Sequence, residues 1–101
     1  MAESVLSKGG VRVRLTSERW AHITDEHCEL AGMRHDVLET LADPSRIVAG
    51  KHGELMAVRE MADGKHLIVV YREQQIDGFV ITAFLTRRTD ALGRRGQIWP
   101  Q

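Results

Sequence analysis

The dipeptide Asp63-Gly64 lies between two β-prone segments, and it strongly limits the folds that this chain can adopt. Aspartate followed by glycine accepts the backbone angles of a tight hairpin turn, so the pair predicts two antiparallel strands. The strand after the turn contains Leu-Ile-Val-Val-Tyr at residues 67–71, the most β-prone run in the sequence, which indicates a central strand. Strands are also predicted at residues 45–49, 54–61 and 79–86. The second half of the chain therefore predicts an antiparallel meander.

The segment after residue 15 has helical periodicity instead. Thr16 or Ser17 can cap a helix, because either hydroxyl can accept a hydrogen bond from a free backbone N–H of the first turn. Trp20, Ile23 and His27 then recur at spacings of three and four residues, which gives this helix one inner stripe.

A second helix is predicted over residues 34–42, where the apolar residues Val37, Leu38 and Leu41 share one face and Pro44 prevents continuation. The predicted fold class is α+β, with two N-terminal helices packed on a four-stranded antiparallel sheet. Residues 11–15 alternate between apolar and charged side chains, so they can add a short extra N-terminal strand at the edge of the sheet.

The length of 101 residues fits a single domain. Residues 1–10 are expected to be disordered, residues 11–88 to form the α+β domain, and residues 89–101 to form a basic C-terminal tail. No apolar run approaches the roughly 20 residues that span a bilayer, and the N-terminus has no hydrophobic stretch typical of a signal peptide. We therefore expect a cytoplasmic protein without a membrane partner. Cys28 is the only cysteine, so an internal disulfide and a cysteine-rich zinc site are excluded.

The formal net charge is zero, with 14 basic and 14 acidic residues, but the charges are unevenly distributed. The segment from residue 87 to the end has one acidic residue, Asp90, against four arginines: Arg87, Arg88, Arg94 and Arg95. A basic segment of this kind can hold a phosphate backbone. The alternative interpretation is a solvated chain terminus.

Two histidines on the first predicted helix are candidates for acid–base chemistry. His22 and His27 are five residues apart, which turns them about 140° around a helix, unlike a zinc-binding pair four residues apart. If the helix ends near Glu26, His27 leaves the helical register and both imidazoles can reach the sheet from one side. In the alternative interpretation His27 caps the helix or packs under Trp20, and His22 is solvated.

Two further candidates lie in the predicted strands. Arg59 falls on the same side of its strand as the apolar Ala57. A charged residue on an apolar side lies either at the rim of the sheet or in a position that a functional role requires. Thr82 is in the middle of a strand, on the side that the alternation predicts it to share with Val80 and Phe84. A purely structural threonine is the alternative, since this residue type favours strands.

Together these residues suit the cleavage of RNA by its own 2′-hydroxyl. That reaction needs a base for the hydroxyl, an acid for the 5′-oxygen and positive charge for the phosphorane. His22 as base and His27 as acid, or the reverse, can act near neutral pH. Arg59 can pair with phosphate oxygens, and Thr82 can position one of them. The reaction needs no metal ion or other cofactor.

Five segments in this order resemble motifs of a known family. Residues 19–30 read Arg-Trp-Ala-His-Ile-Thr-Asp-Glu-His-Cys-Glu-Leu, with Cys28 where the family usually has proline. They are followed by Leu-Ala-Asp-Pro at 41–44, Ala-Val-Arg at 57–59, the run at 67–71, and Val-Ile-Thr-Ala-Phe at 80–84. The chain is similar here to small phage and toxin nucleases of the barnase–EndoU–colicin–RelE superfamily of ribonucleases.

The resemblance implies two helices before a four-stranded sheet, and a small metal-independent endoribonuclease that serves as the toxin of a toxin–antitoxin pair. The expected partners are RNA and a cognate antitoxin or immunity protein. The implied catalytic positions are His22, His27, Arg59 and Thr82, with Arg19 as a phosphate contact. Further RNA-binding positions are Arg72, Arg87, Arg88, Arg94 and Arg95. Two alternatives stay open: a non-catalytic protein- or RNA-binding module of the same fold, and a metal-binding sensor that uses His22, His27 and His35.

Overall fold

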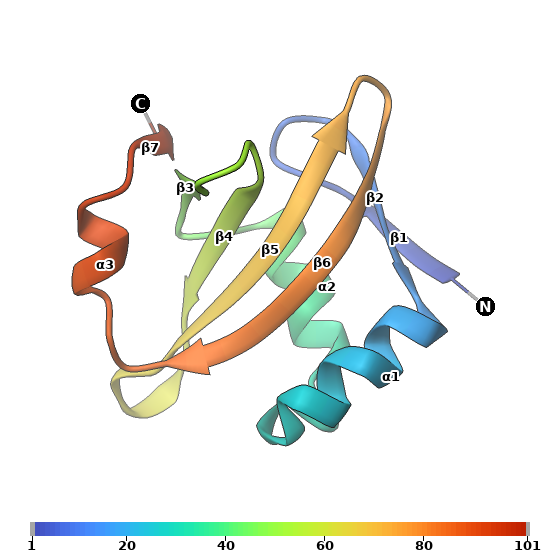
Figure 1. Ribbon diagram of the computed structural model, residues 1–101, viewed down its shortest axis with the longest axis horizontal. Coiled ribbons are helices and arrows are strands. Elements are labelled where there is room, and N and C mark those ends of the chain that lie inside the picture. Colours follow the sequence, from blue (N-terminus) through green and yellow to red (C-terminus); the bar gives the residue numbers. More distant parts are fainter. Residues whose placement is uncertain (1, 101) are drawn as a thin grey trace.

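The computed structural model describes residues 2–100, which form a curved sheet with helices packed along it (Figure 1). The helices are α1 (Ser17–Glu26), α2 (Arg34–Ala42) and the short α3 (Asp90–Gly93), with 3-10 turns at Cys28–Leu30 and Ala62–Gly64. The strands are β1 (Ala2–Leu6), β2 (Arg12–Thr16), β3 (Arg46–Ala49), β4 (Leu55–Glu60), β5 (His66–Gln74), β6 (Asp77–Thr86) and β7 (Gln97–Trp99). Within residues 2–100, no helix is long and apolar enough to cross a membrane.

The sheet has seven strands in the order β1-β2-β6-β5-β4-β3-β7, so the expected four-stranded antiparallel sheet is wrong. The four predicted strands exist as β3 to β6 and form the expected antiparallel meander. The sheet is mixed because β2 runs parallel to β6, pairing Arg12–Arg14 with Asp77–Phe79. More than 60 residues separate these partners along the chain. Local alternation of side chains cannot reveal such a pairing, which explains the incorrect prediction.

Both ends of the chain are more ordered than their composition predicts. The expected disorder at residues 1–10 is contradicted by β1, which pairs with β2 along its whole length. Because of this pairing, β2 is not the edge strand of the sheet. Met1 lies outside the described residues. The expected basic tail contains α3 and then β7, which pairs with β3. Short strands with polar residues acquire their structure from a neighbouring strand, so their own sequence gives little sign of it.

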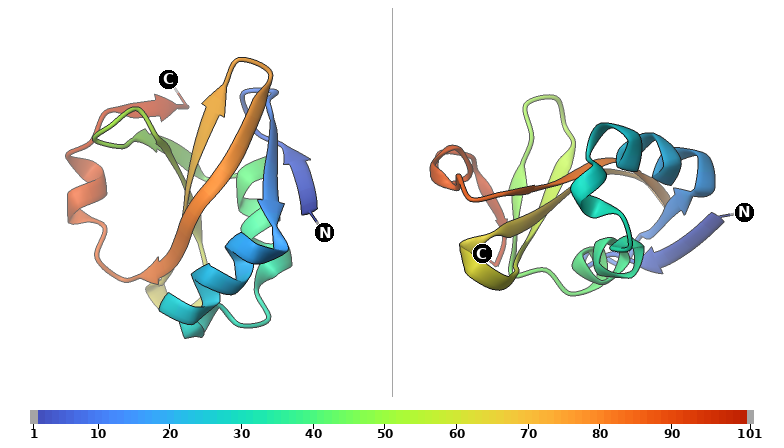
Figure 2. Two further views of the ribbon diagram at one scale, coloured as in Figure 1. Left: turned by 45° about the vertical axis from the view of Figure 1, so that its right-hand side comes forward. Right: turned by 90° about the horizontal axis from the view of Figure 1, so that it is seen from below.

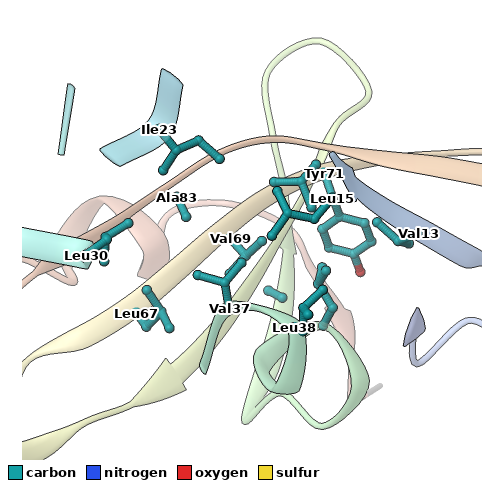
Figure 3. Packing of buried hydrophobic residues seen from close by; sticks show 13 residues of the cluster. Val13, Leu15, Ile23, Leu30, Val37, Leu38, Leu67, Val69, Tyr71 and Ala83 are labelled. Carbon is teal, nitrogen blue, oxygen red and sulfur yellow. The ribbon is translucent and has the colours of Figure 1, made fainter. Parts of the chain in front are cut away.

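The main core lies between the sheet and the helices α1 and α2 (Figure 3). Helix α2 has the predicted bounds, and its predicted stripe of Val37, Leu38 and Leu41 is buried. Helix α1 contributes Ile23, which is buried, and Trp20, which is partly buried against the same cluster. Leu67 and Val69 face these helices from β5, which lies between β4 and β6 and is the predicted central strand. We call this side of the sheet the helix face.

The opposite side of the sheet, which we call the second face, has its own smaller apolar cluster. Its buried members are Val48, Met56, Val58, Ile68 and Leu92, and the partly buried Val70 and Phe84 pack against them. Leu92 comes from α3, so this short helix anchors the C-terminal segment on the second face. The β3–β4 hairpin projects away from α2 on this side (Figure 2).

A β-bulge in β6 determines which of its side chains reach each face. Thr82 is paired with Val70, but Val80 is paired with the next residue of β5, Tyr71, so Ile81 is an extra residue. Val80 therefore packs in the helix-face core, whereas Thr82 and Phe84 are on the second face. The expectation that Val80 shares a side with Thr82 is thus wrong, because simple alternation cannot anticipate a bulge.

Tyr71 provides a test of this core. Its ring is fully buried, and its hydroxyl forms no hydrogen bond within the part of the chain that the structure describes. We expect Tyr71→Phe to increase the free energy of unfolding by about 1–3 kcal/mol at neutral pH, because an unsatisfied buried hydroxyl is removed. Urea unfolding followed by tryptophan fluorescence measures the change. A loss of stability in Tyr71→Phe would show that the hydroxyl has a partner.

The same residue predicts a dependence on alkaline pH. Burial raises the pKa of Tyr71 above its ordinary value, with a smaller contribution from the carboxylate of Glu73. A folded-state pKa above the unfolded one gives stability that is complete below about pH 10 and is lost as the pH rises further. Wild type should therefore lose stability above about pH 10, and Tyr71→Phe should lose less. Tyr71 is the only tyrosine, so its ionisation can be followed by ultraviolet absorbance.

Candidate functional site

Helix α1 lies beside the half of β6 that has no strand on that side. Among residues 2–100, β2 pairs with β6 only as far as Phe79. The chain leaves the sheet after Thr16, whose side chain caps α1 by accepting a hydrogen bond from the backbone N–H of Arg19 at 3.0 Å. Helix α1 therefore begins where the parallel pairing has ended, and it packs against the rest of β6 (Figure 2).

Two contacts fix the position of α1 along β6. The guanidinium Nη1 of Arg19 donates to the carbonyl oxygen of Ile81 at 3.3 Å. At the other end of the helix, the ring centroids of His27 and Phe84 are 6.0 Å apart. Thr82 lies between Ile81 and Phe84 along β6, and His22 lies between Arg19 and His27 along the chain. We call Arg19, His22, His27, Thr82 and Phe84 the α1–β6 seam.

His27 leaves the helical register, as the sequence predicts for a helix that ends near Glu26. It is the C-terminal cap of α1, with φ −127° and ψ 72°. These backbone angles let the imidazole reach Phe84 on the second face. Its Nδ1 is 3.8 Å from a carboxylate oxygen of Glu29, and its side chain is 32% exposed. The ring is thus partly packed but still accessible to a ligand.

His22 stands at the outer rim of the seam. Its Nε2 is 2.7 Å from Oε1 of Glu26, one turn further along the helix, and its side chain is 60% exposed. A neutral imidazole that donates from Nε2 has a free lone pair on Nδ1, so it can accept a proton there. His22 also lines a surface pocket together with Thr16, Glu18 and Arg19.

Arg59 is not part of the seam, contrary to the predicted grouping. It is paired in register with Leu67, and its Nη2 is 3.5 Å from a carboxylate oxygen of Glu39 on α2, so it lies on the helix face. Strand β4 is also separated from β6 by β5. Arg59 and Thr82 therefore lie on opposite sides of the sheet and cannot hold one phosphate between them. The alternation within β4 is as expected, but the bulge in β6 and the position of α1 are not visible in the sequence.

The remaining arginines with an expected role in RNA binding lie in several places. Arg72 donates from Nη2 to the carbonyl of His52 at 3.0 Å, and Arg95 lines a pocket on the second face. Arg87 donates to the carbonyl of Asp63 in the β4–β5 turn. Two others, Arg88 and Arg94, are exposed. The anchoring of Leu92 keeps this segment against the domain, so it is not a free tail.

The metal-sensor interpretation is not supported by the placement of its histidines. Within residues 2–100, no group of three or more histidine, cysteine, aspartate or glutamate side chains could hold a metal ion. His35, the third expected ligand, is on α2 and is paired with Glu39, with Nε2 3.4 Å from a carboxylate oxygen. His22 and His27 are instead associated with Glu26 and Glu29.

One residue of the seam and two residues of the adjacent pocket are absent from the sequence-based prediction of the site. Phe84 shares the side of Thr82, and the alternation in its strand could have identified it. Lys51 and His52 lie in the β3–β4 turn and line the pocket that contains Phe84 and Arg95. Only the tertiary structure brings this turn to the second face, so no local signal could have identified them.

Comparisons with known proteins found no matching family model, no matching curated protein and no matching solved structure. The resemblance of the motifs to the ribonuclease superfamily therefore stays a prediction.

Proposed function

We propose that this chain is a cytoplasmic, metal-independent endoribonuclease that cleaves RNA through attack of a 2′-hydroxyl on the adjacent phosphate. The observation that supports it best is the α1–β6 seam. At this seam, Arg19 contacts the backbone of Ile81 and the ring of His27 lies near that of Phe84. His22 lies on the same helix and Thr82 on the same strand. These are the groups that the reaction requires, and all are at least partly accessible.

Each group has a defined role in the proposed reaction. His22 takes the proton of the 2′-hydroxyl at Nδ1, and the 2′-oxygen then forms a bond to phosphorus. His27 in its protonated form gives a proton to the 5′-oxygen as its bond to phosphorus breaks. The products are a 2′,3′-cyclic phosphate and a 5′-hydroxyl. The two histidine roles can be exchanged without changing this balance.

Arg19 replaces Arg59 as the cation of the proposed site. Only its Nη1 donates to Ile81, so its other N–H groups remain available for phosphate oxygens. A guanidinium held by one backbone contact is positioned before the substrate arrives, which favours stabilisation of the developing charge. Thr82 can donate a hydrogen bond to a phosphate oxygen, and Phe84 can stack on a base.

We further propose that the protein is the toxin of a toxin–antitoxin pair, since unrestrained RNA cleavage would harm the cell that produces it. The cognate antitoxin or immunity protein would cover the seam or the second face. A non-catalytic binding module is the second candidate. It is favoured by the position of Arg59, because the arginine that the family motif implies is not near the seam.

Replacement of either imidazole tests the proposed chemistry. His22→Gln and His27→Gln should each lower kcat for RNA cleavage by roughly a hundred- to ten-thousand-fold, because an acid or a base is lost. His35→Gln is the matched control, since that side chain is 87% exposed on α2 and away from the seam. Wild-type cleavage should persist in EDTA, follow a bell-shaped pH profile and give 2′,3′-cyclic phosphate ends.

All variants are first checked for folding by circular dichroism. If folded His22→Gln and His27→Gln cleave as well as His35→Gln, the seam is not the active site. If wild type cleaves no RNA, with or without divalent metal, the binding-module candidate replaces the ribonuclease.

The identity of the catalytic cation is tested by two arginine variants. Arg19→Ala should lower kcat by roughly a hundred- to a thousand-fold, because a transition-state contact is lost. Arg59→Met keeps the aliphatic stem and should leave kcat almost unchanged, since Arg59 lies on the helix face. Steady-state cleavage of a fluorogenic RNA measures both. The reverse order of effects would return the role to Arg59.

A further inference from the structure

We infer that a groove on the second face binds the backbone of single-stranded RNA beside the cleaved phosphate, an inference that rests on the proposed function. The groove is lined by Gly50, Lys51, His52, Glu54, Met56, Val70, Phe84 and Arg95. Phe84 belongs both to this groove and to the α1–β6 seam. One strand of nucleic acid can therefore extend from the proposed site of cleavage into the groove.

One wall of the groove is the β3–β4 turn, which is held in place by side chains. The carboxylate of Glu54 accepts a hydrogen bond from the backbone N–H of His52 at 2.7 Å. Arg72 donates to the carbonyl of the same residue at 3.0 Å. A Cβ at Gly50 would overlap the Glu54 side chain, so a larger residue there would displace the carboxylate that caps this turn. The turn is thus fixed against the sheet with Lys51 beside the groove.

The floor and the opposite wall come from the sheet and from the C-terminal segment. Met56, Val70 and Phe84 form an apolar floor. Leu92 is buried in the same apolar cluster, and this contact holds the following residues close enough for Arg95 to line the groove. An apolar and aromatic floor between cationic walls is the usual arrangement of sites for single-stranded nucleic acid.

The charges of the groove favour a polyanion. Lys51 and Arg95 line it, Arg72 supports its wall, and Glu54 is the only acidic residue of the lining. The hydrogen bond from the His52 backbone lowers the pKa of the Glu54 carboxyl, so Glu54 is ionised at neutral pH. Its charge is directed at the turn, where it accepts that hydrogen bond. The net charge of these four side chains is positive, whereas the whole chain is neutral.

Single-stranded nucleic acid fits this groove better than a duplex. Phe84 is half-buried in the floor. Only a base that is not paired with a second strand can turn out and stack on such a recessed ring. Phosphates on either side of that base would then meet Lys51 and Arg95 on the walls. No hydrogen bonds to base edges are needed, so we expect little sequence preference in the groove.

Binding of a fluorescein-labelled single-stranded DNA oligonucleotide tests the inference, because DNA lacks the attacking 2′-hydroxyl and cannot be cleaved. Fluorescence anisotropy at several salt concentrations gives Kd and its salt dependence. Lys51→Ala and Arg95→Ala should each weaken binding and reduce the slope of log K against log salt by roughly 0.7. Phe84→Leu should weaken binding by roughly five- to a hundredfold through lost stacking. Lys8→Ala is the matched control, since Lys8 lies over the ring of Trp99, outside the groove.

The outcomes separate this inference from the proposed function. If Lys51→Ala and Arg95→Ala bind the oligonucleotide as Lys8→Ala does, while wild type still cleaves RNA, the groove inference is overturned and the ribonuclease stands. If the groove variants lose binding but wild type cleaves no RNA, the groove stands and the catalytic proposal fails. Equal affinity for a duplex of the same length would also contradict the groove, since a duplex cannot place a base on Phe84.

Discussion

The short pairing between β2 and β6 determines where helix α1 lies. Residues 12–14 of β2 form hydrogen-bonded pairs with residues 77–79 of β6. The chain then leaves the sheet, and Thr16 caps the start of α1. If the pairing continued, a strand would occupy the edge of β6 where α1 now lies. Because it stops, the backbone carbonyl of Ile81 is free to accept a hydrogen bond from Arg19. The candidate site is thus the consequence of one strand that ends early.

The two faces of the sheet have different roles: the helix face carries the main core, and the second face carries the proposed groove. The helix face carries the larger core, with α2 and the inner side of α1 packed against it. The second face has a smaller apolar cluster that anchors the C-terminal segment through Leu92. This division explains how a chain of zero net charge can have a positively charged groove: cations from a turn and from the C-terminal segment converge on one side. The bulge at Ile81 then directs Thr82 and Phe84 to that side.

Elements with a strong local pattern could be predicted from the sequence, whereas long-range pairing could not. Helix α2, the hairpin at Asp63-Gly64 and the central strand β5 follow from periodicity and turn residues, because the forces that form them act between near neighbours. The parallel pairing of β2 depends on β6, and β7 near the C-terminus depends on β3, which are both distant along the chain. Strand β1 near the N-terminus is ordered by its pairing with β2. The same distinction applies to the site. The departure of His27 from its helix was predictable from where that helix ends, but the position of Arg59 behind the sheet was not.

Nuclear magnetic resonance can show whether RNA binds at the α1–β6 seam. Isotope-labelled protein is titrated with a 2′-O-methylated RNA oligonucleotide, whose blocked 2′-oxygen cannot attack the phosphate. If RNA binds there, the imidazole signals of His22 and His27 and the backbone amide signals of Thr82 and Phe84 should shift. The imidazole of His35 on α2 should not move. Shifts confined to α2, or no shift of these four residues at a large excess of RNA, would show that RNA does not bind at the seam.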